Sequence, residues 1–272
     1  MDPTVVRSLT REYRIRTQSP ELAAVLPFLD ARPEMVGAEL TAMDLAANVV
    51  ADGIQLRLPS GDEVLGTYVQ AWGRLAVSMF RAIQEEAPGA PLVHAASLIS
   101  PSGERTIIVG PKGAGKSTLT LHLLGRGFAF EGDEHIVLRE ADLISRPRRM
   151  RVKPGSLPLV PHAADAVLNS PSLIDGKGMT VYAVDPSFTG TPWRIAPGRA
   201  SRLIFLEPNH GGRSSISPLG SDETFRRLAE HCFLPATQAA LASARLRKLA
   251  METPAYELRL GDLDEARRAL EF

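Results

Sequence analysis

The chain has 272 residues, 44% of them hydrophobic, which is enough apolar material for a sizeable packed core. Its 31 basic and 31 acidic residues balance, so its charge gives no sign of a nucleic-acid or membrane-surface partner, and we expect neither. The single cysteine, Cys232, excludes an intramolecular disulfide, and the absence of a signal-peptide pattern or a run of about 18 apolar residues leads us to expect a cytoplasmic protein.

Residues 1–65 predict a small N-terminal lobe of mixed structure. Its predicted elements are alternating strands at residues 13–17 and 53–58, a short helix at 21–29 and a hairpin turn at 59–62. Apolar residues then recur at helical spacing, which predicts a helix over residues 64–86 that Pro88-Gly89 ends.

Residues 66–272 predict an α/β or α+β domain with a mixed sheet. The strands expected here lie at residues 92–99, 106–109, 128–130, 136–138, 179–183, 202–206 and 255–260. The expected helices lie at residues 116–126, 222–232 and 237–250, with a last helix from Asp262. Residues 147–161 are basic and rich in proline, which predicts an irregular loop.

Residues 110–118 fit the pattern G-x-x-x-x-G-K-[ST] between a predicted buried strand and a predicted helix, the context of a phosphate-binding loop. In such a loop backbone N–H groups turn toward phosphate oxygens, and the helix N-terminus adds partial positive charge. Lys116 would reach the β- and γ-phosphates, and Ser117 would ligate Mg²⁺. We therefore expect binding of ATP and Mg²⁺ by Gly110, Gly113, Ala114, Gly115, Lys116, Ser117 and Thr118.

Two adjacent carboxylates, Asp133 and Glu134, follow the predicted loop helix and a short predicted strand. A helix residue advances about 1.5 Å and a strand residue about 3.3 Å, so the chain is long enough to return to the phosphate end. There one carboxylate could hold Mg²⁺, and the other could orient or deprotonate an attacking hydroxyl. The same dipeptide could instead be a solvated turn.

His94 lies near the end of the predicted strand that precedes the loop strand. A lone histidine on an apolar strand is more often a core residue than a site residue, and its type alone leaves both open. No H-x-x-x-H pair and no G-x-S-x-G sequence is present, so the chain gives little support to a metalloenzyme or a serine hydrolase.

Together these motifs resemble the HPr kinase/phosphorylase family and its relatives, which share a nucleotide core like that of phosphoenolpyruvate carboxykinase. The resemblance is carried by His94, the loop at residues 110–117, Arg126-Gly127 and Asp133-Glu134, and it extends more loosely to Pro197-Gly198-Arg199. It covers residues 90–140 closely and continues to about residue 210. The short spacing between the loop and the acids is the specific part, because such loops also occur in transport ATPases and helicases, whose second acidic motif usually lies much farther away.

The resemblance implies a role for each matching position. Asp133 would be the catalytic base that accepts the proton of a serine hydroxyl, Glu134 would assist with Mg²⁺, and His94 would support the base. Arg199 would contact a phosphate or a neighbouring subunit. Since the family tends to form oligomers, a homo-oligomer is expected by analogy.

The acceptor is less clearly indicated. Asn169-Ser-Pro-Ser172 and Asp175-Gly-Lys-Gly178 stand where the family has a glycine-rich signature tied to the HPr protein and to phosphorolysis, so the chain is more similar to the divergent relatives that include lasso-peptide tailoring kinases. We expect a kinase for a serine in a peptide or protein. The basic residues 146–153 could face that acceptor or the triphosphate. A small-molecule kinase, for example for free serine, and a non-catalytic ATP-binding regulatory module are the alternatives.

Overall fold

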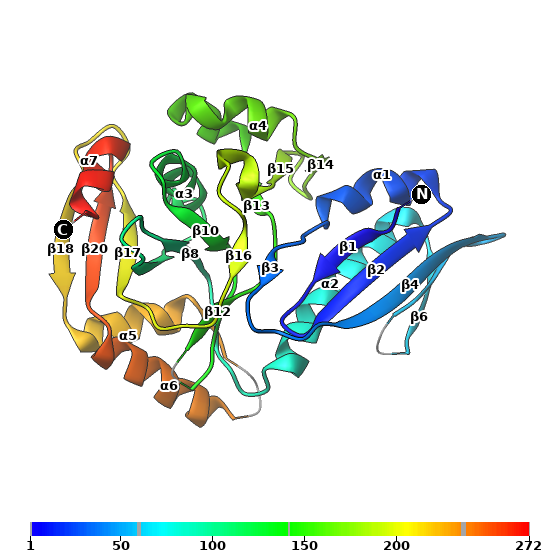
Figure 1. Ribbon diagram of the computed structural model, residues 1–272, viewed down its shortest axis with the longest axis horizontal. Coiled ribbons are helices and arrows are strands. Elements are labelled where there is room, and N and C mark those ends of the chain that lie inside the picture. Colours follow the sequence, from blue (N-terminus) through cyan, green and yellow to red (C-terminus); the bar gives the residue numbers. More distant parts are fainter. Residues whose placement is uncertain (1, 59–60, 141, 235–237, 272) are drawn as a thin grey trace.

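The computed structural model describes residues 2–58, 61–140, 142–234 and 238–271. Within this part of the chain it is a mixed α/β structure in which several mixed sheets lie side by side, so the fold class expected from the sequence is confirmed at that level (Figure 1). None of the helices in the described ranges is long and apolar enough to cross a membrane.

The N-terminal part is a five-stranded sheet (blue to cyan in Figure 1) in which β2 and β4 are parallel and the other neighbours are antiparallel. Its strands, in sheet order, are β1 (Thr4–Arg7), β2 (Arg11–Thr17), β4 (Thr41–Val50), β5 (Gly53–Arg57) and β6 (Glu63–Gly66). Three helical segments accompany it: α1 (Pro20–Val25), the 3-10 turn η1 (Leu26–Phe28) and α2 (Tyr68–Glu86). The expected hairpin turn includes residues 59–60, which lie outside the described residues.

Helix α2 begins later than the apolar spacing predicts. Residues 64–66 belong to β6 and pair with β5, so the expectation of a helix from Val64 is wrong there. The reason is a capping box: the Thr67 hydroxyl accepts from the backbone N–H of Gln70, and the Gln70 side chain accepts from the backbone N–H of Thr67 over 2.9 Å. This reciprocal pair stabilises a helix start at Tyr68.

The buried face of α2 packs on the N-terminal sheet. Ala71, Leu75 and Met79 share one apolar cluster with the strand residues Ile15 and Leu45. The core of the N-terminal sheet therefore contains residues from both sides of the boundary expected at residue 65.

A six-stranded sheet forms the centre of the remaining chain, and its strands β9, β17 and β20 run parallel. The order is β10 (Ala129–Gly132), β8 (Ala95–Ile99), β9 (Arg105–Val109), β17 (Arg202–Pro208), β20 (Ala255–Leu260) and β18 (Ser215–Leu219). The helices of this part are α3 (Lys116–Leu124), α4 (Ala164–Leu168), α5 (Ser221–Glu230), α6 (Ala239–Glu252) and α7 (Leu263–Ala269). The expected start of the α6 helix, Thr237, lies outside the described residues.

Smaller sheets complete the architecture. One has the order β12 (Leu143–Ser145), β11 (Ile136–Leu138), β7 (Leu92–Val93) and β19 (Cys232–Phe233), and another has β13 (Met150–Val152), β15 (Thr180–Val184) and β14 (Ser172–Ile174). The parallel pair β3 (Glu34–Met35) and β16 (Arg194–Ile195) joins the N-terminal part to the rest. Three further 3-10 segments are η2 (Pro154–Leu159), η3 (Pro161–Ala163) and η4 (Pro186–Thr189).

The segment 147–161 is more regular than its composition predicts. It contains β13, which pairs with β15, followed by the 3-10 turns η2 and η3. Pro154 and Pro161 stand at the starts of those turns, where the fixed φ of proline suits the first helical position. The expectation of an irregular loop is therefore wrong, and the basic side chains of this segment are held on structured backbone.

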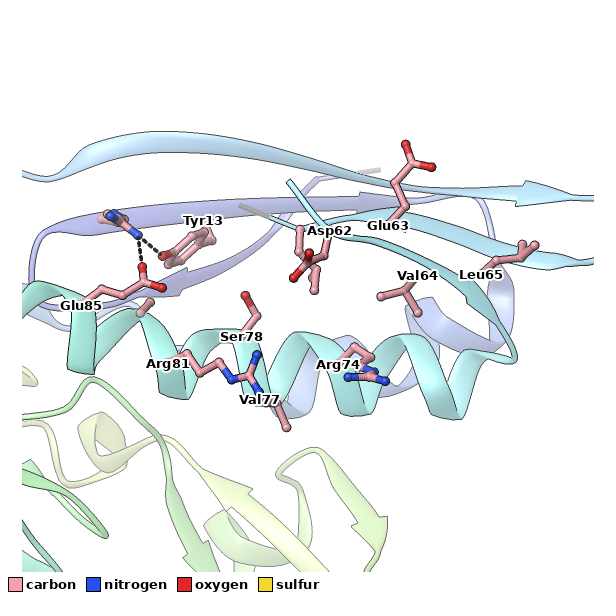
Figure 2. Close-up of a pocket in the computed structure, with 13 residues that line it drawn as sticks. Tyr13, Asp62, Glu63, Val64, Leu65, Arg74, Val77, Ser78, Arg81 and Glu85 are labelled. Carbon is pink, nitrogen blue, oxygen red and sulfur yellow. Dashed lines mark hydrogen bonds and ion pairs between the residues drawn. The ribbon is translucent and has the colours of Figure 1, made fainter. Parts of the chain in front are cut away.

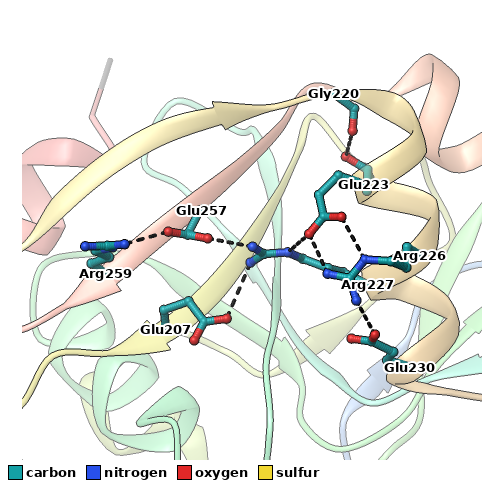
Figure 3. A network of polar contacts seen from close by, with 9 residues as sticks. Glu207, Gly220, Glu223, Arg226, Arg227, Glu230, Glu257 and Arg259 are labelled. Atoms are coloured by element: carbon teal, nitrogen blue, oxygen red, sulfur yellow. Dashed lines mark hydrogen bonds and ion pairs between the residues drawn. The ribbon is translucent and has the colours of Figure 1, made fainter.

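Ion pairs fasten helix α5 to the central sheet (Figure 3). The Arg227 guanidinium lies 2.6 Å from Glu257 on β20 and 2.7 Å from Glu223 on its own helix. Glu207 on β17 lies 3.5 Å from the same guanidinium. One half-buried arginine thus links α5 to two parallel strands of the sheet.

Candidate functional site

The loop at residues 110–115 joins β9 to α3 and has the conformation that its glycines permit. Gly113 and Gly115 have φ angles of +91° and +96°, a region that side chains with a Cβ rarely adopt. A Cβ at Gly115 would also lie 2.7 Å from Leu260 Cδ2. The local sequence therefore dictates the turn, and α3 begins directly after it at Lys116.

The Lys116 side chain folds back under this loop. Its Nζ donates to the carbonyl oxygens of Gly110, at 2.6 Å, and Pro111, at 3.2 Å. Burial lowers the pKa of Lys116, while the negative charges of Asp133 and Glu134 act in the opposite direction. The ammonium group thus lies between the loop and the two carboxylates.

An irregularity in β10 brings Asp133 to the loop. The antiparallel register between β10 and β8 shifts between Phe130 and Gly132, and a Cβ at Gly132 would lie 2.5 Å from Ser145 Cβ. Asp133 follows at once, only 4% exposed, and Ser117 Oγ donates to its Oδ2 over 3.3 Å. Burial, and then the neighbouring charge of Glu134, raises the pKa of Asp133 above its ordinary value.

Glu134 occupies a different environment from its neighbour. Its backbone has a φ of +79°, which is unusual for a residue other than glycine, and its N–H donates to Asp133 Oδ1 over 2.8 Å. Its carboxylate lies 2.7 Å from Arg148 Nη1. Burial alone would raise the pKa of Glu134, but Arg148, followed by His94 and His135, outweighs it and holds the pKa at about 2.

The side chain beside Ser117 is therefore Asp133. Glu134, expected as a Mg²⁺ ligand, is instead paired with Arg148. The nearest oxygens suited to a divalent cation are the Ser117 hydroxyl and the Asp133 carboxylate. In the described part of the chain no group of three or more His, Cys, Asp or Glu side chains could hold a metal ion. Ser117 and Asp133 fit Mg²⁺, which takes few protein ligands and completes its shell with phosphate and water oxygens.

His94 interrupts the strand in which it is expected and lies between β7 and β8. Its backbone N–H donates to the His231 carbonyl over 2.7 Å. Burial lowers the pKa of the His94 ring, and the charge of Lys116 adds to this effect, while Glu134 opposes it. His94 lines the same cleft as the loop and the two acids.

A cleft of about 1440 Å³ brings these residues together with parts of the N-terminal lobe. Its lining includes the loop residues 112–118, His94, Asp133 and Glu134. From the segment 147–161 the lining residues include Arg148, Arg151, Lys153, Gly155 and Ser156. Thr118 and Ser156 also share a hydrogen bond of 2.8 Å between their hydroxyls. Three members of the basic run at residues 146–153, Arg148, Arg151 and Lys153, thus line the cleft, and their contact with an acceptor or a triphosphate stays a prediction.

The structure does not bring Arg199 to this cleft. Arg199 is exposed and precedes β17. Because β17 runs parallel to β9, its first residue lies at the sheet edge opposite to the loop. Arg199 is also not among the described residues that line the cleft. It therefore does not contact a phosphate bound at the loop of its own chain, and contact with a neighbouring subunit stays a prediction.

Gly198, the residue before Arg199, has a structural role. A Cβ at Gly198 would overlap Arg105 Nη1, and Arg105 forms a buried ion pair with Glu131 at 2.7 Å. Gly198 also pairs with Leu143 in an isolated bridge. The Pro197-Gly198-Arg199 segment thus covers a buried charge pair and is remote from the loop.

One part of the lining was not anticipated: residues 210–212, His-Gly-Gly, which follow β17. The sequence contains a feature that could have predicted this, namely a Gly-Gly pair shortly after the strand expected at residues 202–206. The carboxyl ends of neighbouring parallel strands meet at one edge of a sheet. Since β17 is the parallel neighbour of β9, a Gly-Gly pair directly after it lies beside the loop.

A second hollow, of about 460 Å³, lies in the N-terminal lobe between α2 and the strands (Figure 2). Tyr13, Arg74, Ser78 and Arg81 are among its lining residues. Arg11 in this hollow is already engaged, since its Nη1 donates to Glu85 over 3.4 Å and to Tyr13 Oη over 3.5 Å. It contains none of the loop residues, so the cleft at the loop is the better candidate site.

Comparison with known proteins adds little. No family model matches the chain. The mitochondrial iron-sulfur clusters transporter ATM1 of Gibberella zeae is 38% identical over 76 residues, which are 26% of this chain and 11% of that protein. A match over so small a share of both chains shows neither a common family nor a common activity.

Proposed function

We propose that this protein is a kinase that uses ATP and Mg²⁺ to phosphorylate a hydroxyl group, most simply that of a serine in a peptide or protein. The observation that carries the proposal is Asp133. It is buried, its pKa is raised, and its Oδ2 lies 3.3 Å from the hydroxyl oxygen of Ser117, the second residue of α3. A carboxylate with a raised pKa accepts a proton more readily near neutral pH than an ordinary aspartate does.

The loop residues 110–118 would hold the triphosphate through backbone N–H groups and the α3 N-terminus. Lys116 would leave the carbonyls of Gly110 and Pro111 and donate to the β- and γ-phosphates. Ser117 would ligate Mg²⁺ directly and Asp133 would hold it only through a water molecule, which leaves the Asp133 carboxylate free to accept a proton. Bound Mg²⁺ would supply positive charge to the phosphates. When bound, ATP would provide the phosphoryl group. The acceptor oxygen would form a bond to the γ-phosphorus while the bond between the γ-phosphorus and the β–γ bridging oxygen breaks, and ADP would leave with the electron pair of the broken bond.

Asp133 would take the hydroxyl proton as the acceptor oxygen attacks. Glu134 and Arg148 would fix the orientation of Asp133. Arg148 forms an ion pair with the Glu134 carboxylate, and the backbone N–H of Glu134 donates a hydrogen bond to Asp133 Oδ1. His94 lines the same site, and its lowered pKa favours the uncharged imidazole. An uncharged imidazole adds no positive charge that would oppose proton uptake by Asp133.

The apolar part of the cleft lining favours a peptide acceptor over a small metabolite. Beyond the loop, the cleft is lined by Phe28 and by Val69 and Trp72 of α2, apolar side chains that could contact residues on either side of an acceptor serine. We further propose that the core is of the HPr-kinase and phosphoenolpyruvate-carboxykinase type, on the motifs at residues 90–140, and that the protein acts as a homo-oligomer in the cytoplasm.

The test is mass spectrometry of a source-cell lysate incubated with ATP, Mg²⁺ and either the native protein or Asp133→Asn. The proposal expects phosphoserine on a peptide or protein only with the native enzyme. A new small phosphate ester would instead assign a metabolite kinase. If neither product forms while ATP still binds, Asp133 is not a catalytic base and an ATP-dependent regulatory module is the better account.

A further inference from the structure

Arg151 lines the cleft but is not explained by the chemistry at the loop. It lies on β13, and its Cζ is 3.4 Å from the centroid of the Phe28 ring. Its Nε and Nη1 atoms are buried and have no hydrogen-bond partner among the described residues. A buried guanidinium N–H without an acceptor is costly, so two such atoms in a cleft wall indicate a missing acceptor.

The charges around Arg151 point to an anion. The run from Arg146 to Lys153 holds five basic side chains, and in the described ranges carboxylates pair with only two of them, Arg148 with Glu134 and Arg149 with Asp185. Burial, and then the charge of Arg148, lowers the pKa of Arg151 to about 8. A bound anion would oppose both effects, because a nearby negative charge stabilises the charged guanidinium.

Trp72 adds a third donor from another element. Its Nε1 is buried without a partner in the part of the chain that the structure describes, and its ring lies 6.3 Å from that of Phe28. Phe28, Trp72, Leu173 and Val181 belong to one apolar cluster and all line the cleft. The N-terminal lobe and the β14–β15 pair therefore form an apolar wall around buried N–H donors.

We propose that Arg151 and Trp72 form a subsite that binds a carboxylate of the acceptor peptide, with Phe28 and Leu173 contacting an apolar residue next to it. The inference rests on the proposed kinase function in assigning the occupant of the cleft as an acceptor. A carboxylate is favoured over the triphosphate because the loop at residues 110–118 already provides for phosphates. The planar guanidinium fork also matches the two oxygens of a carboxylate.

The test measures binding, so it does not depend on turnover. Full-length protein carrying Asp133→Asn is titrated, by fluorescence anisotropy, with three labelled octapeptide pools that share a central serine and a flanking phenylalanine. One pool contains glutamate and has an amidated C-terminus, one contains glutamine and is amidated, and one contains glutamine and has a free C-terminus. We expect the glutamate pool, the free-C-terminus pool or both to bind at least 10-fold more tightly than the neutral amidated pool, and the pattern identifies the source of the carboxylate.

Matched variants then assign the preference to Arg151. Arg151→Met, which keeps an unbranched side chain on Phe28 without the charge, should abolish the difference between pools, and Arg151→Lys should retain part of it. Arg57→Gln, an exposed arginine of the N-terminal sheet, should leave the preference intact. Equal binding of all pools, a preference that survives Arg151→Met, or no detectable binding would overturn the inference. So would a loss of ATP affinity in Arg151→Met without a change in peptide affinity.

A parallel assay of phosphate incorporation from ATP by the native protein separates the two proposals. Carboxylate preference without phosphoryl transfer would leave the subsite in place and reject the kinase. Transfer that ignores peptide charge would reject the subsite and leave the kinase. Thermal melting of each variant checks that Arg151→Met is folded, which we expect because the substitution removes an unpaired buried charge.

Discussion

Ser117 donates a hydrogen bond to Asp133 Oδ2 over 3.3 Å, which joins the first turn of α3 to the residue that follows β10. The contact places a buried carboxylate at the mouth of the glycine-rich loop, although 15 residues separate the two in sequence. It also divides the acidic pair, because Asp133 faces the loop while Glu134 faces Arg148. The separate environments of the two carboxylates give Asp133 and Arg148 different expected mutational effects.

Asp133→Asn should reduce phosphoryl transfer by about 100- to 10,000-fold, since an amide of the same shape cannot accept the proton. ATP binding should be retained, because the loop and Lys116 are unchanged. Single-turnover measurement of ADP formation, with nucleotide affinity from calorimetry, checks both parts. Asp44→Asn, an exposed position on β4, is the matched control and should behave as the native protein does. Full activity in Asp133→Asn would contradict the assignment.

Lys116→Gln should weaken ATP binding by about 10- to 100-fold, because a charge-assisted hydrogen bond contributes about 1.5–3 kcal/mol and 1.4 kcal/mol is tenfold in affinity. Lys116→Gln should therefore lose ATP affinity, whereas Asp133→Asn should keep ATP affinity and lose phosphoryl transfer. The two variants together separate nucleotide binding from the chemical step. Lys248→Gln on the exposed face of α6 is the control. Unchanged affinity in Lys116→Gln would exclude the loop as the triphosphate site.

Arg148→Gln should lower stability at pH 7 by about 1–2 kcal/mol, between the values for exposed and fully buried pairs. The folded pKa of Glu134, about 2, is below its unfolded value of 4.5, so the pair stabilises the fold above pH 4.5. That contribution disappears as the pH falls toward 2.

Arg148 also lowers the pKa of Asp133, so the Arg148→Gln substitution should raise the pKa values of both carboxylates. Urea unfolding of both proteins between pH 7 and pH 2 should show the difference shrinking below pH 4.5, and a difference that grows in acid would refute this account.

Gly198→Ala should destabilise the protein by about 2–3 kcal/mol, because the new methyl group displaces a guanidinium that is buried and ion-paired. Arg105 cannot move aside cheaply, since its Nε and Nη2 donate to Glu131 over 2.7 and 2.8 Å. Gly73→Ala is the matched control: it lies in α2 with nothing within 4 Å of the added Cβ, and should stabilise by about 0.5–1 kcal/mol. Chemical denaturation measures both, and similar stabilities for the two variants would show that the backbone at Gly198 can relax.

The sequence alone predicted the strand, loop and helix from β9 to α3, because their determinants are local. The buried run before the loop and the glycines at positive φ specify this conformation within about a dozen residues. The return of Asp133 to the loop could be predicted from chain length. The register shift in β10 and the close approach of Gly132 to Ser145 could not, because both involve strands that are distant in sequence.

What only the tertiary structure decided is which distant side chains share the cleft. Arg151 meets Phe28, whose ring lies 6.3 Å from that of Trp72, because β13 pairs with β15 and that sheet packs against Phe28. No local pattern encodes these contacts. Arg199 follows a glycine in a motif that suggested phosphate contact, yet the parallel direction of β17 places it at the opposite sheet edge. Backbone conformation is set by neighbours in sequence, whereas strand order and the packing of one lobe on another are set by apolar surfaces far apart in the chain.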